Sequence, residues 1–253
     1  MLTDAVFLLR FHAWFALIAA ATLAPCLLQP TFPHLKLTPH SDGLAVCFLV
    51  LAWHVALALL SASRPHLRLM WRFVATLSVF MVVPDWFLVR ALRTLEFPDN
   101  GAWKIGSAVS VYMAGMWSIP LMCLLACCTP ANRTANRFVD GANRHPHSCR
   151  QQLVAPLRAA AIALLIFGGA EQLSQPLRLW SSTATVKRTV GHVALYVLPA
   201  EALLGAVTLL AYRATGASEV TGWSTWMQHV VAAAAVAVIY TGALAVSYLF
   251  VEL

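Results

Sequence analysis

Residues 69–92 read LMWRFVATLSVFMVVPDWFLVRAL, an apolar stretch that is long enough to cross a membrane and contains one carboxylic acid, Asp85. The hydrocarbon core of a bilayer requires about 20 consecutive apolar residues in a helix. Six further stretches meet this requirement: 6–28, 44–62, 105–128, 153–177, 189–213 and 227–251. The sequence therefore predicts an all-α polytopic membrane protein, a seven-transmembrane-helix bundle that forms a single domain over residues 1–253.

The overall composition agrees with this fold class. Of the 253 residues, 60% are hydrophobic and 11% are charged, and the mean hydropathy is +0.73. Soluble domains are about 45–50% apolar and about 25% charged. The net charge of +7 comes from Arg and Lys residues in short connections, where topology signals belong, so we predict no nucleic-acid partner.

The distribution of positive charge favours a cytoplasmic N-terminus by a small margin, because cytoplasmic loops carry an excess of Lys and Arg. Eight positive residues are expected on the N-terminal side: Arg10, Arg64, Arg68, Arg133, Arg137, Arg144, Arg150 and Arg213. Seven are expected on the other side: Lys36, Arg90, Arg93, Lys104, Arg178, Lys187 and Arg188. Arg outnumbers Lys by 14 to 3, a bias typical of GC-rich bacteria, so we predict a multi-pass protein of the bacterial inner (plasma) membrane.

Three carboxylic acids lie inside predicted helices: Asp85 in MVVPDWFLV, Glu171 in IFGGAEQLS and Glu201 in YVLPAEALLG. One ionisable group at mid-depth costs about 2.5–3.5 kcal/mol on insertion scales, so three of them indicate a function. With a rise of 1.5 Å per residue, all three fall in one half of the bilayer, roughly 10–18 Å below the same surface. We predict that Glu201, Asp85 and Glu171 are catalytic residues.

Polar residues continue from Glu171 at helical spacing, namely Ser174, Gln175 and Arg178. Side chains three and four residues apart lie on the same helix face. This stripe would carry protons or contact a polar headgroup, or it would form a hydrogen-bonded seam between helices. The sequence leaves these alternatives open.

Prolines accompany the acids. Pro84, Pro120 and Pro199 each remove a backbone hydrogen bond, and in a membrane the freed carbonyl needs another partner or a cavity. Each half of the chain thus reads as an acid, a short loop with aromatic residues, and a helix interrupted by proline. This similarity predicts a weak internal repeat, which is a common way to build a site at a midplane interface.

A carboxylic acid in a dry, apolar site stays protonated and can donate its proton to a hydrophobic substrate. Protonation of an alkene and carbocation cyclisation also require exclusion of water and π-faces that stabilise positive charge. Four aromatic residues are predicted to contact such a substrate: Trp86, Tyr112, Trp117 and Tyr196. Trp103 and Trp180 are predicted to be interfacial anchors.

The motif Leu198–Pro199–Ala200–Glu201, in a helix preceded by an acid-bearing helix and a loop tryptophan, resembles the integral-membrane lycopene cyclase family. These small polytopic proteins carry a Pro-x-Glu-Glu/Asp motif in a repeated three-helix unit, and membrane-bound meroterpenoid cyclases are similar in size and use of buried acids. The chain departs from the motif at Ala202, where the family has its second acid.

The resemblance implies an isomerase or intramolecular lyase of carotenoid or terpenoid biosynthesis. Such an enzyme cyclises an isoprenoid or polyene substrate by proton addition, without net redox change. By the same likeness Glu201 matches the first motif acid, Glu171 matches the acid of the preceding helix, and Asp85 corresponds to Glu171 in the first repeat.

Three other functions fit parts of this pattern. Buried carboxylates and broken helices also occur in proton-coupled transporters. In a non-catalytic scaffold, the acids would pair with Arg90, Arg178 or one another. A haem or quinone redox protein would need facing histidines at equal depth; the candidates are His12, His54, His192 and His229.

The expected partners follow from the membrane setting. The six cysteines lack paired CxxC spacing, so we predict no metal site, and we predict no cofactor. A hydrophobic, lipid-like small molecule and membrane lipids are the predicted partners.

Overall fold

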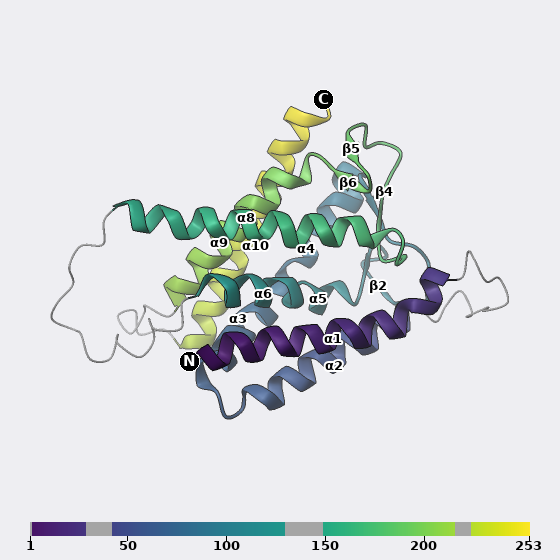
Figure 1. The fold of residues 1–253 in the computed structure, drawn as a ribbon. Coiled ribbons are helices and arrows are strands. Elements are labelled where there is room, and N and C mark those ends of the chain that lie inside the picture. Colours follow the sequence, from purple (N-terminus) through teal and green to yellow (C-terminus); the bar gives the residue numbers. More distant parts are fainter. Residues whose placement is uncertain (1, 29–41, 130–148, 216–223) are drawn as a thin grey trace.

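The structure, a computed structural model, describes residues 2–28, 42–129, 149–215 and 224–253. Within these residues, six helices are long and apolar enough to cross a membrane, and a shorter apolar helix covers Met113–Cys128. The strands form three ladders of two residues each (Figure 1). The chain is therefore an all-α polytopic membrane protein with a seven-helix bundle, as predicted. Arg133, Arg137, Arg144 and Lys36, used above for topology, lie outside the described residues.

The helices are α1 (Leu2–Leu28), α2 (Asp42–Ser61), α3 (Pro65–Phe80), α4 (Val82–Phe87), the π-helix η1 (Leu88–Leu92), α5 (Met113–Met116), α6 (Ser118–Cys128), α8 (Cys149–Ser174), α9 (Val197–Thr215) and α10 (Thr225–Val251). The strands are β1 (Leu95–Glu96), β2 (Lys104–Ile105), β3 (Val109–Ser110), β4 (Ser181–Ser182), β5 (Thr189–Val190) and β6 (Val193–Ala194).

Two predicted helices begin later than the hydropathy indicated. The stretches 105–128 and 189–213 open with β-hairpins, β2–β3 and β5–β6, so the helical segments begin only at Met113 and Val197. The hairpins turn at Gly106 and Gly191, whose φ angles of 57° and 62° suit glycine. Apolar, β-branched strands carry the same hydropathy as a helix end, so hydropathy alone does not separate the two.

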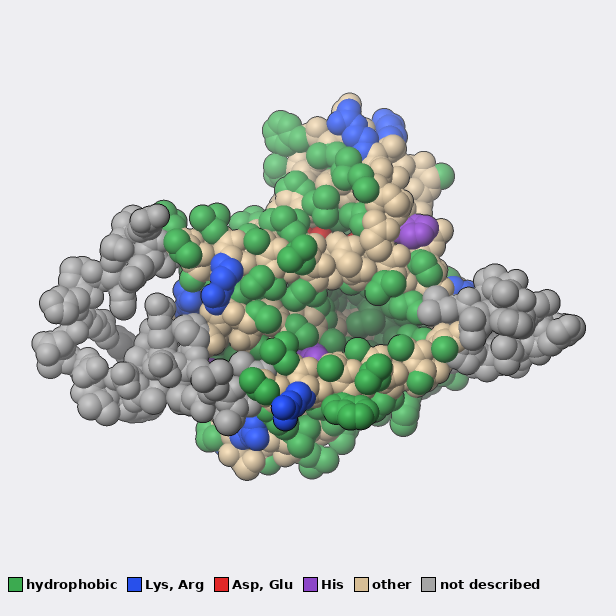
Figure 2. All heavy atoms as spheres, viewed as in Figure 1, with side chains coloured by type: hydrophobic (Ala, Val, Ile, Leu, Met, Phe, Trp, Pro, Cys, Tyr) green, Lys and Arg blue, Asp and Glu red, His purple; other side chains and the backbone are tan. Residues whose placement is uncertain are grey.

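The strands gather at one end of the bundle, near the C-terminus, and the N-terminus lies at the opposite end (Figure 1). We call the end that carries the strands the strand side. Hydrophobic side chains are spread over the whole face seen in Figure 2, and only a few Lys and Arg side chains interrupt them. This is the distribution expected of a bundle whose middle faces lipid.

Helices α8 and α9 pack closely because Gly205 has no side chain. A Cβ atom there would contact the Cβ of Ala163 and lie 2.6 Å from the carbonyl oxygen of Ala159. Small residues at a helix crossing allow the two backbones to approach in a membrane. Helix α10 packs against α9, α3 and α4, so it joins the two halves of the chain.

The order of elements repeats. A first unit runs from α3 through β1 and the β2–β3 hairpin to α6, and a second runs from α8 through β4 and the β5–β6 hairpin to α9. In each unit an arginine with left-handed backbone follows the first helix, Arg93 (φ 57°) and Arg178 (φ 54°). In each unit a tyrosine, Tyr112 or Tyr196, follows the hairpin directly before the next helix. This order supports the predicted internal repeat.

Exchanged contacts connect the two units. Tyr112 donates a hydrogen bond to the carbonyl oxygen of Leu179 at 2.6 Å, and Tyr196 donates to Oγ1 of Thr94 at 2.6 Å. Each acceptor directly follows the left-handed arginine of its own unit. Strand β1 of one unit also pairs antiparallel with β4 of the other. These reciprocal contacts relate the units by an approximate twofold axis.

The π-helix brings the two acids into equivalent positions. Asp85 lies eight residues before Arg93, whereas Glu171 lies seven residues before Arg178. Helix η1 absorbs the additional residue, because a π-turn holds one residue more than an α-turn. Asp85 and Glu171 are therefore equivalent in the repeat.

The structure changes one part of the predicted repeat. Trp117 and Glu201 each lie five residues after the tyrosine of their unit, so these two positions are equivalent. Pro120 lies eight residues after its tyrosine and Pro199 lies three residues after its own. The pairing of the two prolines in the repeat was wrong.

The prolines mark the beginnings of helical segments. Pro84, Pro120 and Pro199 are the third residues of α4, α6 and α9. The first four N–H groups of an isolated helix have no partner within it, so proline costs little there. The predicted interruption at Pro199 is wrong, because α9 begins only two residues earlier. Interruptions occur instead at Met81 and Trp117, between α3 and α4 and between α5 and α6.

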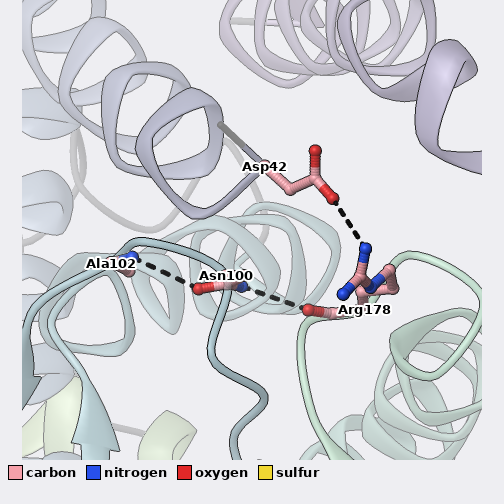
Figure 3. A network of polar contacts seen from close by, with 4 residues as sticks. All are labelled: Asp42, Asn100, Ala102 and Arg178. Atoms are coloured by element: carbon pink, nitrogen blue, oxygen red, sulfur yellow. Dashed lines mark hydrogen bonds and ion pairs between the residues drawn. The ribbon is translucent and has the colours of Figure 1, made fainter. Parts of the chain in front are cut away.

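A polar network holds the strand side together (Figure 3). The Asn100 side chain donates to the carbonyl oxygen of Arg178 at 3.2 Å and accepts from the backbone N–H of Ala102 at 3.3 Å. Arg178 forms an ion pair with Asp42 at 3.4 Å. The backbone N–H of Gly43 donates to the carbonyl oxygen of Asn100 at 2.8 Å. The start of α2 is thereby attached to loops of both units.

We predict that Gly205→Ala destabilises the protein. The added methyl group meets α8 backbone, which cannot move aside without separating the helices, and overpacking of this kind costs about 1–3 kcal/mol. The thermal midpoint in detergent should fall by several degrees. Gly242→Ala on α10 is the matched control, since a Cβ there meets no atom within 4 Å. Equal midpoints for the two variants would contradict this account of the α8–α9 contact.

Candidate functional site

Asp85 lies inside the bundle on α4 and is 2% exposed. Its Oδ2 accepts a hydrogen bond from Nε1 of Trp117 at 3.0 Å. Trp117 occupies the interruption between α5 and α6, so the break in that helix presents its indole to the acid. The first unit thus contributes an acid and the tryptophan that holds it.

Glu201 is the acid with the fewest contacts. It is 2% exposed, and its Oε2 is buried without a hydrogen-bond partner. It lies four residues after the first residue of α9, because the β5–β6 hairpin replaces the first part of the helix predicted over 189–213. A buried polar group without a partner costs about 1–3 kcal/mol, so its retention calls for an explanation beyond packing.

Glu171 is half-buried and lies three residues before the end of α8. Its Oε1 accepts a hydrogen bond from Nε1 of Trp180 at 3.1 Å. Trp180, predicted to be an interfacial anchor, thus also holds an acid, as Trp117 does for Asp85. Among the three acids, Glu171 is the most exposed.

The three acids share one region of the bundle. Glu171 is close enough to interact electrostatically with Asp85 and with Glu201, and Tyr240 on α10 interacts with all three. Within the described residues, none of the acids forms an ion pair with Arg or Lys. Arg90 donates instead to the carbonyl oxygens of Gly106 and Ser107 on the strand side.

Aromatic rings surround Trp117. Its ring centroid lies 5.3 Å from that of Phe167 on α8 and 6.0 Å from that of Tyr240 on α10, the latter at 70°. Phe167 and Tyr240 are both buried. The acid held by Trp117 therefore lies beside an aromatic cluster contributed by three different helices.

The predicted substrate-contacting residues lie in different places. Trp117 lies at the acids, whereas Trp86 is 46% exposed on the outside of α4, beside Gly106.

The hydroxyls of Tyr112 and Tyr196 are engaged in the contacts between the units. Burial raises the pKa of both tyrosines, which keeps them neutral donors. Trp103 is 80% exposed, as suits the anchoring role predicted for it.

Sequence reasoning missed Tyr240 and Phe167. Tyr240 lies in AAAAVAVIYTGALAV, where it is a polar aromatic residue within an otherwise apolar run, and that contrast was a usable signal. Phe167 carried no such signal, because phenylalanine is common throughout these helices. Only the packing of α8 and α10 brings both rings to Trp117.

The histidines have separate roles in packing. His54 accepts from Trp71 at 3.2 Å through Nδ1, and its Nε2 lies 3.1 Å from the carbonyl oxygen of Gly115. His229 packs edge-to-face against Phe73 with ring centroids 5.9 Å apart, and His12 packs beside Trp53 at a centroid distance of 5.9 Å. His192 is exposed at the β5–β6 turn.

A family model described as a domain of unknown function, DUF6989, matches residues 82–251. The match covers about two thirds of the chain, from α4 to α10, and so the chain belongs to this family. All three acids, Trp117 and Tyr240 lie within the matched residues. No curated protein and no solved structure matches the chain.

We predict that Glu201→Met raises the thermal midpoint. Methionine has a similar length and removes the unpartnered oxygen, a gain of about 1–3 kcal/mol, and each kcal/mol shifts the midpoint of a chain of this size by about 2–4 °C. Glu252 is the matched control, because it is equally buried but accepts the backbone N–H groups of Lys187 and Arg188. Glu252→Met should lower the midpoint. A lower thermal midpoint in both variants would mean that the Glu201 side chain stabilises the packing around it.

Proposed function

We propose that this member of the DUF6989 family is a membrane-embedded cyclase of an isoprenoid or polyene substrate. It would act by carboxylic-acid protonation and carbocation cyclisation, without net redox change. The observation that carries the proposal is Glu201, a buried carboxyl group without a hydrogen-bond partner on Oε2, in a region that also holds two further acids and an aromatic cluster. Such an arrangement destabilises the folded protein, and proteins keep destabilising groups of this kind mainly at functional sites.

Glu201 is the proposed proton donor. No donor or cation in the described residues holds its Oε2, so the neutral acid has no competing interaction to lose when it transfers its proton. An alkene is a weak base, so the donor must be a carboxylic acid shielded from water. The apolar faces of α8, α9 and α10 supply that shielding.

Asp85 is the proposed proton acceptor. Trp117 already donates to its Oδ2, a contact suited to a carboxylate, and Oδ1 is left to receive a proton. A carbocation must lose a proton from a neighbouring carbon to give a neutral cyclic alkene. A donor and an acceptor on different helices allow the proton to arrive and leave on different sides of the substrate.

The aromatic cluster would stabilise the cation between these two steps. Cation–π contacts are worth up to about 2 kcal/mol when desolvated, and tryptophan is the strongest partner. Trp117, Phe167 and Tyr240 provide faces and edges at different angles. Trp86 faces outward, and Tyr112 and Tyr196 hold the units together, so these three residues are proposed to shape the site from outside.

The likeness to the integral-membrane lycopene cyclase family supports the same chemistry. Glu201 stands where that family has the first acid of its motif, and the acids occur in repeated units there too. Ala202 in place of the second motif acid suggests a substrate other than lycopene. A hydrophobic isoprenoid drawn from the surrounding lipid is the proposed partner.

A proton-coupled carrier is the second candidate, favoured by the approximate twofold axis. Repeated units related by an axis along the membrane normal occur in transporters. A carrier would move protons across liposome membranes in a substrate-dependent way and would return the substrate chemically unchanged. A cyclase would convert it.

We further propose that the protein lies in a bacterial inner membrane with its N-terminus in the cytoplasm. The support is the small excess of Arg and Lys expected on that side of the sequence. The strand side would then face the periplasm.

We predict that Glu201→Gln and Asp85→Asn each abolish product formation. Membranes containing the protein are incubated with lycopene, squalene or geranylgeraniol, and isomers of unchanged mass are sought by chromatography and mass spectrometry. Positioned acids and bases contribute roughly 10²–10⁴-fold, so each loss should be about 10²-fold or more. In D₂O the wild-type product should carry one added deuterium.

The control for this experiment is Glu96→Gln, an exposed carboxylate on β1 that lies outside the proposed site. It should retain wild-type yield. Undiminished product in both Glu201→Gln and Asp85→Asn would remove the mechanism.

We predict a graded loss at Trp117. Trp117→Phe keeps an aromatic face but removes the N–H bond to Asp85, a bond to a charged group worth about 1.5–3 kcal/mol, so the rate should fall about 10- to 100-fold. Trp117→Leu also removes the aromatic face, so its rate of product formation should be about tenfold lower again. The rates are read in the same product assay. Identical rates for the two variants would exclude a role for the ring in stabilising the cation.

A further inference from the structure

We propose that Glu171 is a proton relay that connects the buried acids Asp85 and Glu201 with water on the strand side. The inference deepens the proposed function, and it rests on the acid site described there. It gives Glu171 a role distinct from those of its two neighbours, in that it would resupply the site and would not touch the substrate.

The position of Glu171 is the first support. Asp85 and Glu201 are each 2% exposed, whereas Glu171 is half-buried and lies less than one helical turn from the end of α8. Of the three acids, Glu171 is therefore the one most accessible to water.

The electrostatic contacts are the second support. Glu171 interacts with both Asp85 and Glu201. A group whose charge acts on both buried acids, and that is also the most exposed of the three, has the placement that a relay requires. Tyr240 interacts with all three acids, and Tyr196 also interacts with Glu171, so these two hydroxyls lie beside the same route.

The surroundings of Glu171 are the third support. Trp180, from the loop after α8, donates to Oε1, so the carboxyl is held in one orientation. Gln175 lies one helical turn further towards the strand side and is exposed, and Arg178 follows at the surface in an ion pair with Asp42. The polar stripe seen in the sequence thus leads from Glu171 to the water-facing end of the molecule.

The proton balance of the proposed reaction explains why a relay is needed. Glu201 gives its proton to an alkene carbon, and the cyclic cation then loses a proton from a neighbouring carbon to Asp85. The product has the same formula as the substrate, but Glu201 is left ionised and Asp85 protonated. Glu171 would take the proton from Asp85 and pass a proton to Glu201, exchanging with water on the way.

The test requires no substrate. Infrared spectra of the protein in detergent are recorded after dilution into D₂O, and the C=O band of protonated Glu201 is identified by its loss in E201Q. We expect hydrogen–deuterium exchange at this band to slow by about tenfold or more in E171Q, since a positioned proton carrier contributes roughly 10²–10⁴-fold. E96Q, the exposed control on the strand side, should exchange at the wild-type rate.

Conservative variants separate a relay from a structural effect. E171D keeps a carboxyl group and should restore most of the exchange rate. If E171Q does not fold, E171M takes its place, because it keeps the length of the side chain without an exchangeable proton. Equal exchange rates in the wild type and in a folded E171Q or E171M would overturn the proposal, as would exchange within the mixing time in all of them.

The relay and the proposed reaction can fail separately. Slowed exchange in E171Q together with normal product formation in E201Q would retain the relay and reject the cyclase mechanism. If both proposals hold, E171Q should form product at the wild-type rate in the first turnover, because Glu201 begins protonated. Its rate should fall by about tenfold in later turnovers, when Glu201 must receive a new proton. A first turnover as slow as the later ones would show that Glu171 acts on the substrate and is not a relay.

Discussion

The pairing of the two repeated units across the strand side is the contact on which the rest of the structure depends. Strand β1 pairs with β4, and the hydroxyls of Tyr112 and Tyr196 each bond the opposite unit directly after its left-handed arginine. Backbone outside a helix needs hydrogen-bond partners wherever water is excluded, and the β1–β4 pairing and the Tyr112 bond to Leu179 supply some of them. Because they fix the end of each acid-bearing helix, they also give Asp85 and Glu171 equivalent positions in the two units.

The two units have diverged at the position of the proposed chemistry. Trp117 and Glu201 are equivalent positions, yet one is an indole that binds an acid and the other is an acid without a partner on Oε2. A symmetric pair would have placed two such acids, or two such indoles, across the axis. Under the proposed function, this difference lets one unit supply the proton acceptor, Asp85, and the other the proton donor, Glu201.

Burial and exposure divide the three acids in a way that their sequences do not. Each follows an apolar run, and two of them lie beside a proline, so by sequence they looked alike. Asp85 and Glu201 lie inside the bundle, while Glu171 lies near the end of α8 with the polar residues that lead to the surface. The proposed site must stay dry and still exchange protons, and it would use both kinds of position. Trp180 donates a hydrogen bond to Glu171, as Trp117 does to Asp85.

The sequence by itself determined the fold class, the seven apolar segments and the three acids, because the membrane imposes length and composition on every helix that crosses it. It did not determine where the helices at 105 and 189 begin, since apolar strands and helix ends have the same hydropathy. It also assigned the repeat to Pro120 and Pro199, when the equivalent positions are Trp117 and Glu201. Tertiary structure alone decided which aromatic rings surround the acids, because Phe167 and Tyr240 reach Trp117 through the packing of helices far apart in the chain, and no local pattern records such contacts.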